Sequence, residues 1–275
     1  MKRLLRSEWE RLWSRKTTWF SFFSIPIILL GSAKYLLSQN EMLSTNLAQY
    51  TNAWNFPILG LSEMLITAFQ GIILIIVVLT VTEEYRTGQI RMVLIRSYSY
   101  TEILLAKFIV SLGTILLFFF TYFIVSNFLG VIIFSTPKEF PLFFHEDLAT
   151  ILDGMIYNLK FYGIAISTVV AMNSILFFIA VVSRTTTTAI GSGIGFLLFS
   201  LLYPHILPYI KDLIGEVLYM KLFFTSIPMI QWQGITLMLA EKNYWMGWNF
   251  SVIGIYTFVF ACLTMLMTKK KDSFI

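Results

Sequence analysis

The sequence predicts an all-α integral membrane protein, and three observations lead to this class. Apolar and aromatic residues make up 57% of the 275 residues and charged residues only 13%, whereas soluble domains carry about 25% charged residues. The mean hydropathy is +0.76. The apolar runs are ~20 residues long, which suits membrane helices rather than the short alternating strands of a barrel. We therefore expect a single transmembrane domain over residues 1–275, with no separate soluble catalytic domain.

Six apolar runs are long enough to cross a bilayer as helices. They cover residues 18–37, 57–81, 108–134, 161–182, 189–207 and 249–267. A seventh run, 222–240, has no charged residue, but Pro228, Gln231, Gln233 and Gly234 interrupt it. We interpret it as a broken, partly re-entrant element within an outer region, 208–248, because irregular backbone at membrane depth needs protein or water around it.

The orientation follows from the distribution of lysine and arginine. With six spans and a cytoplasmic N-terminus, 14 of the 20 basic residues lie on the cytoplasmic side, as the positive-inside rule requires. A seventh crossing would weaken this bias. The basic charge therefore reflects topology and gives no indication of nucleic-acid binding. We expect a multi-pass protein of a bacterial plasma membrane with both termini in the cytoplasm.

Residues 2–16 are predicted to form an interfacial helix before the first span. At 100° per residue, Leu5, Trp9, Leu12 and Trp13 share one face, with charged residues elsewhere around the helix. This pattern is typical of a helix that lies among lipid headgroups. We expect it to anchor the first span, and a contact with a cytoplasmic partner is compatible with that role.

The segment between the second and third spans is too long and too ordered in pattern for a simple connector. Thr82 is expected to cap a short amphipathic helix over residues 83–97. Ser99 and Glu102 then form a capping box that starts the next helix. A structured, charged segment of this kind is expected to be a docking surface for a cytoplasmic partner.

This segment resembles the signature of the type-2 ATP-binding-cassette (ABC) permease family. Glu84, Gly88 and Lys107 match the acidic residue, the glycine and the closing lysine of that signature. Gln89 and Ala106 depart from it, since the family often has threonine and glycine there. The resemblance implies that 83–97 is a coupling helix seated on a separate ATPase. The residues assigned to this coupling are Glu83, Glu84, Arg86, Gly88, Arg91, Arg96 and Lys107.

The resemblance also implies partners: two ATPase subunits and a second permease subunit, either identical or homologous. The chain has no P-loop pattern G-x-x-x-x-G-K-[ST], so we expect no enzymatic activity and no bound cofactor, with ATP and magnesium on the ATPase. The family places the first and fifth spans at the dimer seam. Gly191 and Gly195 form a GxxxG pair in the fifth span, which serves either that seam or packing within one subunit.

Four polar residues in the spans are candidates for a translocation path: Glu63, Gln70, Asn127 and Asn173. Glu63 either serves function, since charges at membrane depth are costly, or reaches the interface and pairs with Lys34. Each amide either bonds a neighbouring helix or lines the path. No metal site is expected, because His145-Glu146 lacks the second histidine of H-E-x-x-H and Cys262 is the single cysteine.

The expected function is export of an amphipathic or hydrophobic substrate, with an antimicrobial or toxin peptide favoured. The mid-span residues are aromatic and apolar apart from these few amides, which suits a bare ion poorly because an ion needs ligands that replace its hydration shell. The alternatives are an exporter of sodium, with Glu63 as the ligand, or of lipid or polysaccharide. A secondary transporter or a membrane enzyme acting alone is a further alternative, although buried charges and catalytic clusters are not evident in the spans.

Overall fold

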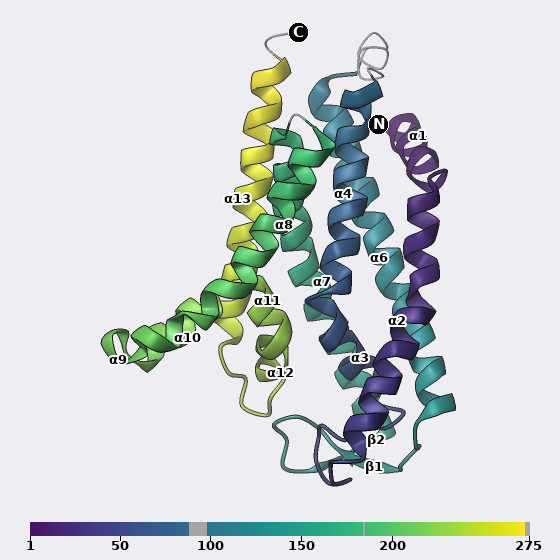
Figure 1. Ribbon diagram of the computed structural model, residues 1–275, viewed down its shortest axis with the longest axis vertical. Helices are drawn as coiled ribbons and strands as arrows, with labels where there is room; N and C mark the ends of the chain where they lie inside the picture. The colour runs from purple at the N-terminus through teal and green to yellow at the C-terminus, as the bar shows by residue number, and fades with distance from the viewer. Residues whose placement is uncertain (88–97, 184, 273–275) are drawn as a thin grey trace.

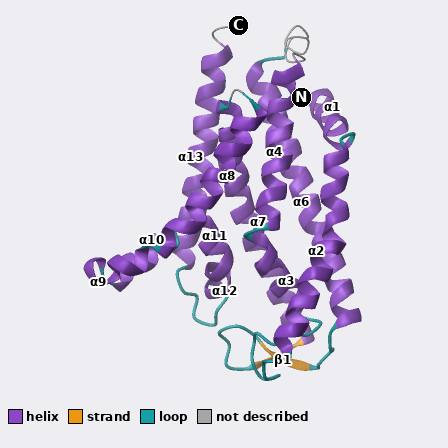
Figure 2. Ribbon diagram, in the orientation of Figure 1, coloured by secondary structure: helices purple, strands orange, loops and turns teal. Residues whose placement is uncertain are grey.

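The computed structural model describes residues 1–87, 98–183 and 185–272, with the backbone alone at 83–87 and 270–272. The described chain is a bundle of long helices with one small hairpin of strands at its end (Figures 1 and 2). The long helices are α2 (Lys16–Asn40), α4 (Ala68–Thr87), α6 (Tyr100–Ile133), α7 (Ile151–Val182), α8 (Thr186–Leu202) and α13 (Met246–Asp272).

The chain is a helical membrane protein. Within the described ranges, five helices are long and apolar enough to cross a membrane, and a sixth span results if α3 (Phe56–Leu65) and α4 count as one. These two helices meet at a bend of 59°. The expectation of one continuous helix over 57–81 is therefore wrong, although the predicted apolar run is at the right place in the sequence.

The N-terminal helix α1 (Lys2–Trp13) turns directly into α2. The hydroxyl of Thr18 donates to the carbonyl of Leu12 at 2.7 Å, and the indole of Trp19 donates to the carbonyl of Trp13 at 2.9 Å. These bonds satisfy carbonyl groups that the end of α1 leaves without helical partners. The corner between α1 and α2 is thus fixed by side chains of α2.

Helices α6 and α7 begin earlier than the apolar runs alone indicate, because both start at a capping box. Ser99 and Glu102 cap α6, which confirms the predicted motif. Thr150 and Asp153 cap α7 in the same way, so this helix starts ten residues before the predicted span. Each box satisfies backbone donors that a helix start otherwise leaves unpaired.

The start of the predicted coupling helix differs from expectation. Thr82 lies inside α4, which continues to Thr87, and its hydroxyl bonds the carbonyl of Val78 and the hydroxyl of Thr186. Thr82 is therefore no N-cap, and the helix that spans the bundle continues into the charged segment. Residues 88–97 of the predicted coupling helix lie outside the described residues.

One end of the bundle carries a short hairpin. Strands β1 (Glu139–Pro141) and β2 (Leu148–Thr150) pair in antiparallel register, with Phe140 opposite Ala149. The ring of Phe140 lies against Gly154 of α7, where a Cβ atom would approach it to 2.4 Å. The hairpin and the loops around it lie at the opposite end from α1 and from the C-terminal end of α13 (Figures 1 and 2).

The segment between α8 and α13 is broken into short helices. They are η1 (Tyr203–His205), η2 (Leu207–Ile210), α9 (Lys211–Ile214), α10 (Glu216–Phe223), α11 (Ile227–Met229), the π-helical turn η3 (Ile230–Gly234) and α12 (Ile235–Met238). Helices α9 and α10 extend away from the bundle (Figure 1). Residues from Phe224 to Met238 include buried side chains that pack against α3, α7 and α8.

Helix α7 forms the centre of the bundle. Of the most apolar 18-residue stretch of each helix, 72% is buried in α7, against 17% in α8 and 11% in α13. Helices α4, α6, α8 and α13 all contact α7. The outer surfaces of α8 and α13 are therefore the parts of the bundle most open to lipid or to partner helices.

Candidate functional site

The Lys107 side chain is buried where α6 meets the N-terminal helix. It is 1% exposed, and its ammonium group donates to Oε2 of Glu8 at 2.7 Å. Glu8 is itself 3% exposed. The charge of Lys107 is therefore used within the chain to bind α1, and the coupling role that the resemblance implies for Lys107 stays a prediction.

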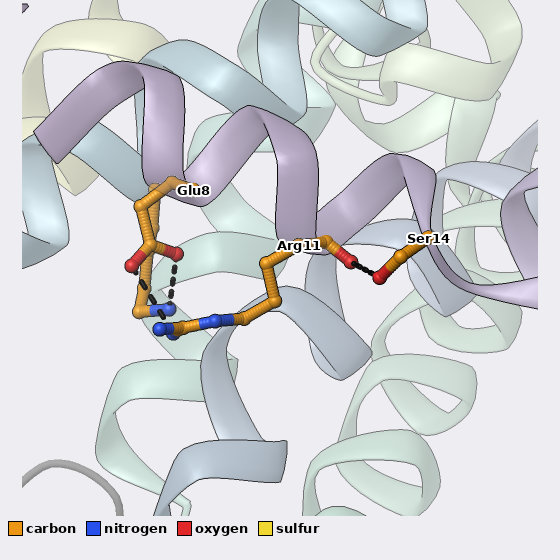
Figure 3. A network of polar contacts seen from close by, with 4 residues as sticks. Glu8, Arg11 and Ser14 are labelled. Atoms are coloured by element: carbon orange, nitrogen blue, oxygen red, sulfur yellow. Dashed lines mark hydrogen bonds and ion pairs between the residues drawn. The ribbon is translucent and has the colours of Figure 1, made fainter. Parts of the chain in front are cut away.

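Glu8 also holds a second cation. Nη1 of Arg11 lies 3.2 Å from Oε1 of Glu8 (Figure 3). Ser14 closes the end of α1 by donating its hydroxyl to the carbonyl of Arg11 at 2.8 Å (Figure 3). A buried charge is tolerated only when it is paired and hydrogen-bonded, and both oxygens of Glu8 meet that condition.

Apolar contacts extend this attachment of α1. Leu4 packs with Ile103 and Ala106 of α6, and the ring of Trp9 lies over Gly113. The buried face of α1 consists of Leu4, Glu8 and Leu12. Of the predicted apolar face, Leu12 lies on this buried side, whereas Leu5, Trp9 and Trp13 keep part of their surface exposed.

The other predicted coupling residues lie in or beyond the last turns of α4. Glu83, Glu84 and Arg86 belong to that helix, of which the backbone is described there. Gly88, Arg91 and Arg96 lie outside the described residues. The two described helices on either side of the predicted coupling segment are thus α4 and α6, and the Lys107–Glu8 pair connects α6 to α1.

The interior of the bundle contains a chain of hydrogen bonds between three elements. Nε2 of Gln70 in α4 donates to Oε1 of Gln231 in η3 at 2.8 Å, and Nε2 of Gln231 donates to the hydroxyl of Thr168 in α7 at 2.9 Å. All three side chains are at most 2% exposed. For Gln70, the expected bond to a neighbouring element is confirmed, and the partner is the broken segment.

The two predicted asparagines behave differently from Gln70. Asn127 bonds the carbonyl of Phe123 in its own helix at 2.8 Å, so the expected contact with another helix is wrong for this residue. Asn173 is completely buried in α7, and neither its amide nitrogen nor its oxygen has a hydrogen-bond partner. A buried amide without partners costs about 1–3 kcal/mol, so Asn173 is one of the buried positions with unused bonding capacity, as is Asn249 in α13.

Glu63 is separated from this interior chain. It is exposed on α3, and no ion pair within the described residues joins it to Lys34. The structure therefore does not bring Glu63, Gln70, Asn127 and Asn173 together into one site. Gln70 and Gln231 form the inner polar contact, while Glu63 faces outward.

Helix α8 presents two different small-residue faces. A Cβ atom on Gly193 would approach Cδ1 of Leu74 in α4 to 2.3 Å, so Gly193 allows α8 to pack closely on α4 of the same chain. A Cβ atom on Gly191 or Gly195 would meet no atom within 4 Å. The GxxxG pair is thus on the open face of α8.

The described residues contain no group of three or more histidine, cysteine, aspartate or glutamate side chains placed to hold a metal ion. Their polar groups bind helices to one another: α1 to α6 through Glu8, and α4 to α7 through the broken segment. Such an arrangement can position helices and transmit their movement.

A family described as "Protein of unknown function (DUF2705)" matches residues 20–274. The chain belongs to the DUF2705 family. No curated protein and no solved structure matches the chain. The match begins after α1. Glu8, which forms the buried pair with Lys107, therefore lies before the matched residues.

Sequence reasoning missed Glu8, Thr168 and the role of Gln231. A signal for Glu8 was present, because Leu4, Glu8 and Leu12 recur at four-residue spacing and so share one helix face. An acidic residue between two buried leucines needs a cationic partner. No pattern in the sequence indicated the partners of Gln231, because these partners depend on how the broken segment folds against α4 and α7.

Proposed function

We propose that this DUF2705 protein is the membrane subunit of an ABC exporter driven by a separate ATPase. The observation that carries the proposal is the segment from Glu84 to Lys107, which resembles the coupling signature of type-2 permeases. It joins α4 to α6 at the end of the bundle where α1 and the C-terminal end of α13 lie (Figure 1). A docking surface there can move two of the helices that contact α7.

The proposed orientation places this end of the bundle in the cytoplasm of a bacterial cell. The segments at this end carry most of the lysine and arginine residues, as the positive-inside rule requires. The hairpin end and the region 208–248 then face outward, and the segment around Gln231 is re-entrant. Helix α1 lies at the inner headgroup layer and contacts membrane lipids.

The proposed assembly has two permease subunits, identical or homologous, and two ATPase subunits. Gly191 and Gly195 support a subunit contact through α8, because their open face leaves room for a close helix from a second subunit. The large apolar side chains on the outer face of α2 support lipid or subunit contacts there. They are Phe20, Phe23, Ile27 and Leu30.

The favoured substrate is an amphipathic peptide. Its support is the apolar character of the spans together with the scarcity of polar side chains at membrane depth. Sodium is less well supported, because an ion requires several ligands and Glu63 is exposed whereas Gln70 and Asn173 are buried. Lipid or polysaccharide export remains an alternative outcome.

Expression of the chain with its ATPase in a sensitive bacterium is expected to raise tolerance to membrane-active cationic peptides and to leave sodium tolerance unchanged. The growth-inhibitory concentration of each agent is the measurement. The Glu63→Gln variant is expected to retain the peptide tolerance. A gain in sodium tolerance that disappears with Glu63→Gln would instead establish sodium export.

A further inference from the structure

A furrow runs along α7, with the hairpin and the segment after α12 on its other side at one end, α13 along its length, and α6 joining α13 at the other end. Four hollows of about 500, 430, 600 and 140 Å³ follow one another along it. Neighbouring hollows share lining residues: Lys160, Leu239 and Asn243 join the first two, Gly163 the next two, and Ala261 the last two. They therefore form one continuous track.

The track is as long as a membrane is thick. Phe250 lines its second hollow and Thr268 its fourth. At 1.5 Å per residue this stretch of α13 is about 27 Å long, close to the roughly 30 Å of the hydrocarbon core. The tail of one bilayer lipid covers only about half of that thickness, so the furrow is longer than a single resident tail needs.

Three of the four hollows present an apolar surface although several hydroxyl groups line them. Ser167 and Ser174 in α7 donate to carbonyls of their own helix at 2.6 and 2.9 Å. Thr257, Thr264 and Thr268 in α13 do the same at 2.7 to 2.9 Å. Because these donors are already used, the furrow suits an apolar occupant and offers little to an ion or a sugar.

The end of the furrow next to the hairpin is different, because charged groups surround it. The hollow there is lined by Asp147, Asp153 and Glu241, against one cation, Lys160. The acidic residues are exposed, so they face the solvent at the mouth of the hollow. An excess of carboxylates at one end of an apolar track is complementary to a molecule with a positive end and an apolar body.

We propose that the α7–α13 furrow binds a cationic amphipathic molecule, with its apolar body along the helices and its positive end at Asp147, Asp153 and Glu241. This inference rests on the proposed export of an amphipathic substrate and adds the place and the charge of that substrate. Binding to the furrow needs no ATPase, so a failure of this binding proposal can be distinguished from a failure of the export proposal.

The binding test uses the full chain with Cys262→Ser in phosphatidylcholine nanodiscs and one new cysteine. Thr257→Cys places it in the furrow, and Ile255→Cys places it on an exposed part of α13 as the control. Hexadecyltrimethylammonium is expected to slow maleimide labelling of Thr257→Cys severalfold and to leave Ile255→Cys unchanged. Hexadecyl sulfate, with the same chain and the opposite charge, is expected to protect much less.

Two substitutions that fill the furrow provide a second test, and a third substitution outside the furrow is the matched control. A Cβ atom on Gly163 or Gly254 would meet no atom within 4 Å, so Gly163→Leu and Gly254→Leu occupy the furrow without forcing the helices apart. Each is expected to abolish protection by the cation. Gly31→Leu in α2, whose Cβ position is equally open, is expected to leave it intact.

Other outcomes overturn the proposal. Equal protection by the cation and the sulfate would identify an ordinary lipid-facing surface. Disulfide-linked pairs through Thr257→Cys would identify a contact between two copies of the chain. Protection that survives both leucine substitutions would place the amphiphile elsewhere. If protection follows the furrow but no peptide tolerance is conferred in cells, the binding site stands and the export proposal falls.

Discussion

Replacing Glu8 by leucine is expected to destabilise the protein by about 3–5 kcal/mol, the typical effect of removing one partner from a buried ion pair. Glu8 contacts both Lys107 and Arg11, so this change removes two charged contacts at once. Lys107→Met removes one of the two and is expected to have a smaller effect. Helix α1 is expected to detach from α6 in both variants.

The double change Glu8→Leu with Lys107→Met distinguishes pairing from packing. Replacing both partners of a buried pair by apolar residues is often neutral, so the double variant is expected to recover much of the lost stability. The Glu10→Gln variant is the control, because its partner Arg6 is on the exposed side of the same helix. Thermal unfolding and proteolysis of α1 in detergent micelles measure the effects. Additive losses in the double variant would contradict the pairing.

Replacing Gln231 by leucine is the second change with a large expected effect. It removes the acceptor for Gln70 and the donor to Thr168, and leaving a buried amide without its partner costs about 1–3 kcal/mol. Residues 224–238, which pack into the bundle, are then expected to loosen from α4 and α7. Gln70→Leu is expected to destabilise through the same contact, so the two losses should be less than additive.

The neighbouring Gln233 provides the control for that experiment. It lies in the same π-helical turn but is exposed, so Gln233→Leu is expected to change the midpoint of thermal unfolding little. Hydrogen exchange of the backbone over residues 224–238 reports the loosening directly. Unchanged exchange in Gln231→Leu would show that the interior hydrogen bonds do not hold this segment.

The long apolar helices were predictable because the membrane imposes their length and composition. The bend between α3 and α4 was not, since no proline or glycine stands at Ile66 or Thr67 to signal it. The early start of α7 could have been found from Thr150 and Asp153, which have capping-box spacing. Local rules thus predict helix ends where a capping pair is present in the sequence.

The polar contacts inside the bundle depend on which helices meet, and the sequence does not contain that information in local form. Lys107 is at the position predicted for a coupling residue, yet its partner is 99 residues away in the chain. Gln70 and Gln231 are separated by 161 residues. Residue type alone indicates that such groups need partners, and the three-dimensional arrangement decides which partners they have.

The most direct test of the central claim is isolation of the complex from native membranes followed by an ATPase assay. The full chain is expected to co-isolate with a P-loop ATPase, and the complex is expected to hydrolyse ATP. The double change Glu84→Ala with Gly88→Leu is expected to preserve the amount of the chain and to lower partner binding or ATP hydrolysis. A wild-type chain that is isolated alone, in preparations that hydrolyse no ATP, would contradict the proposal that it is an ABC permease.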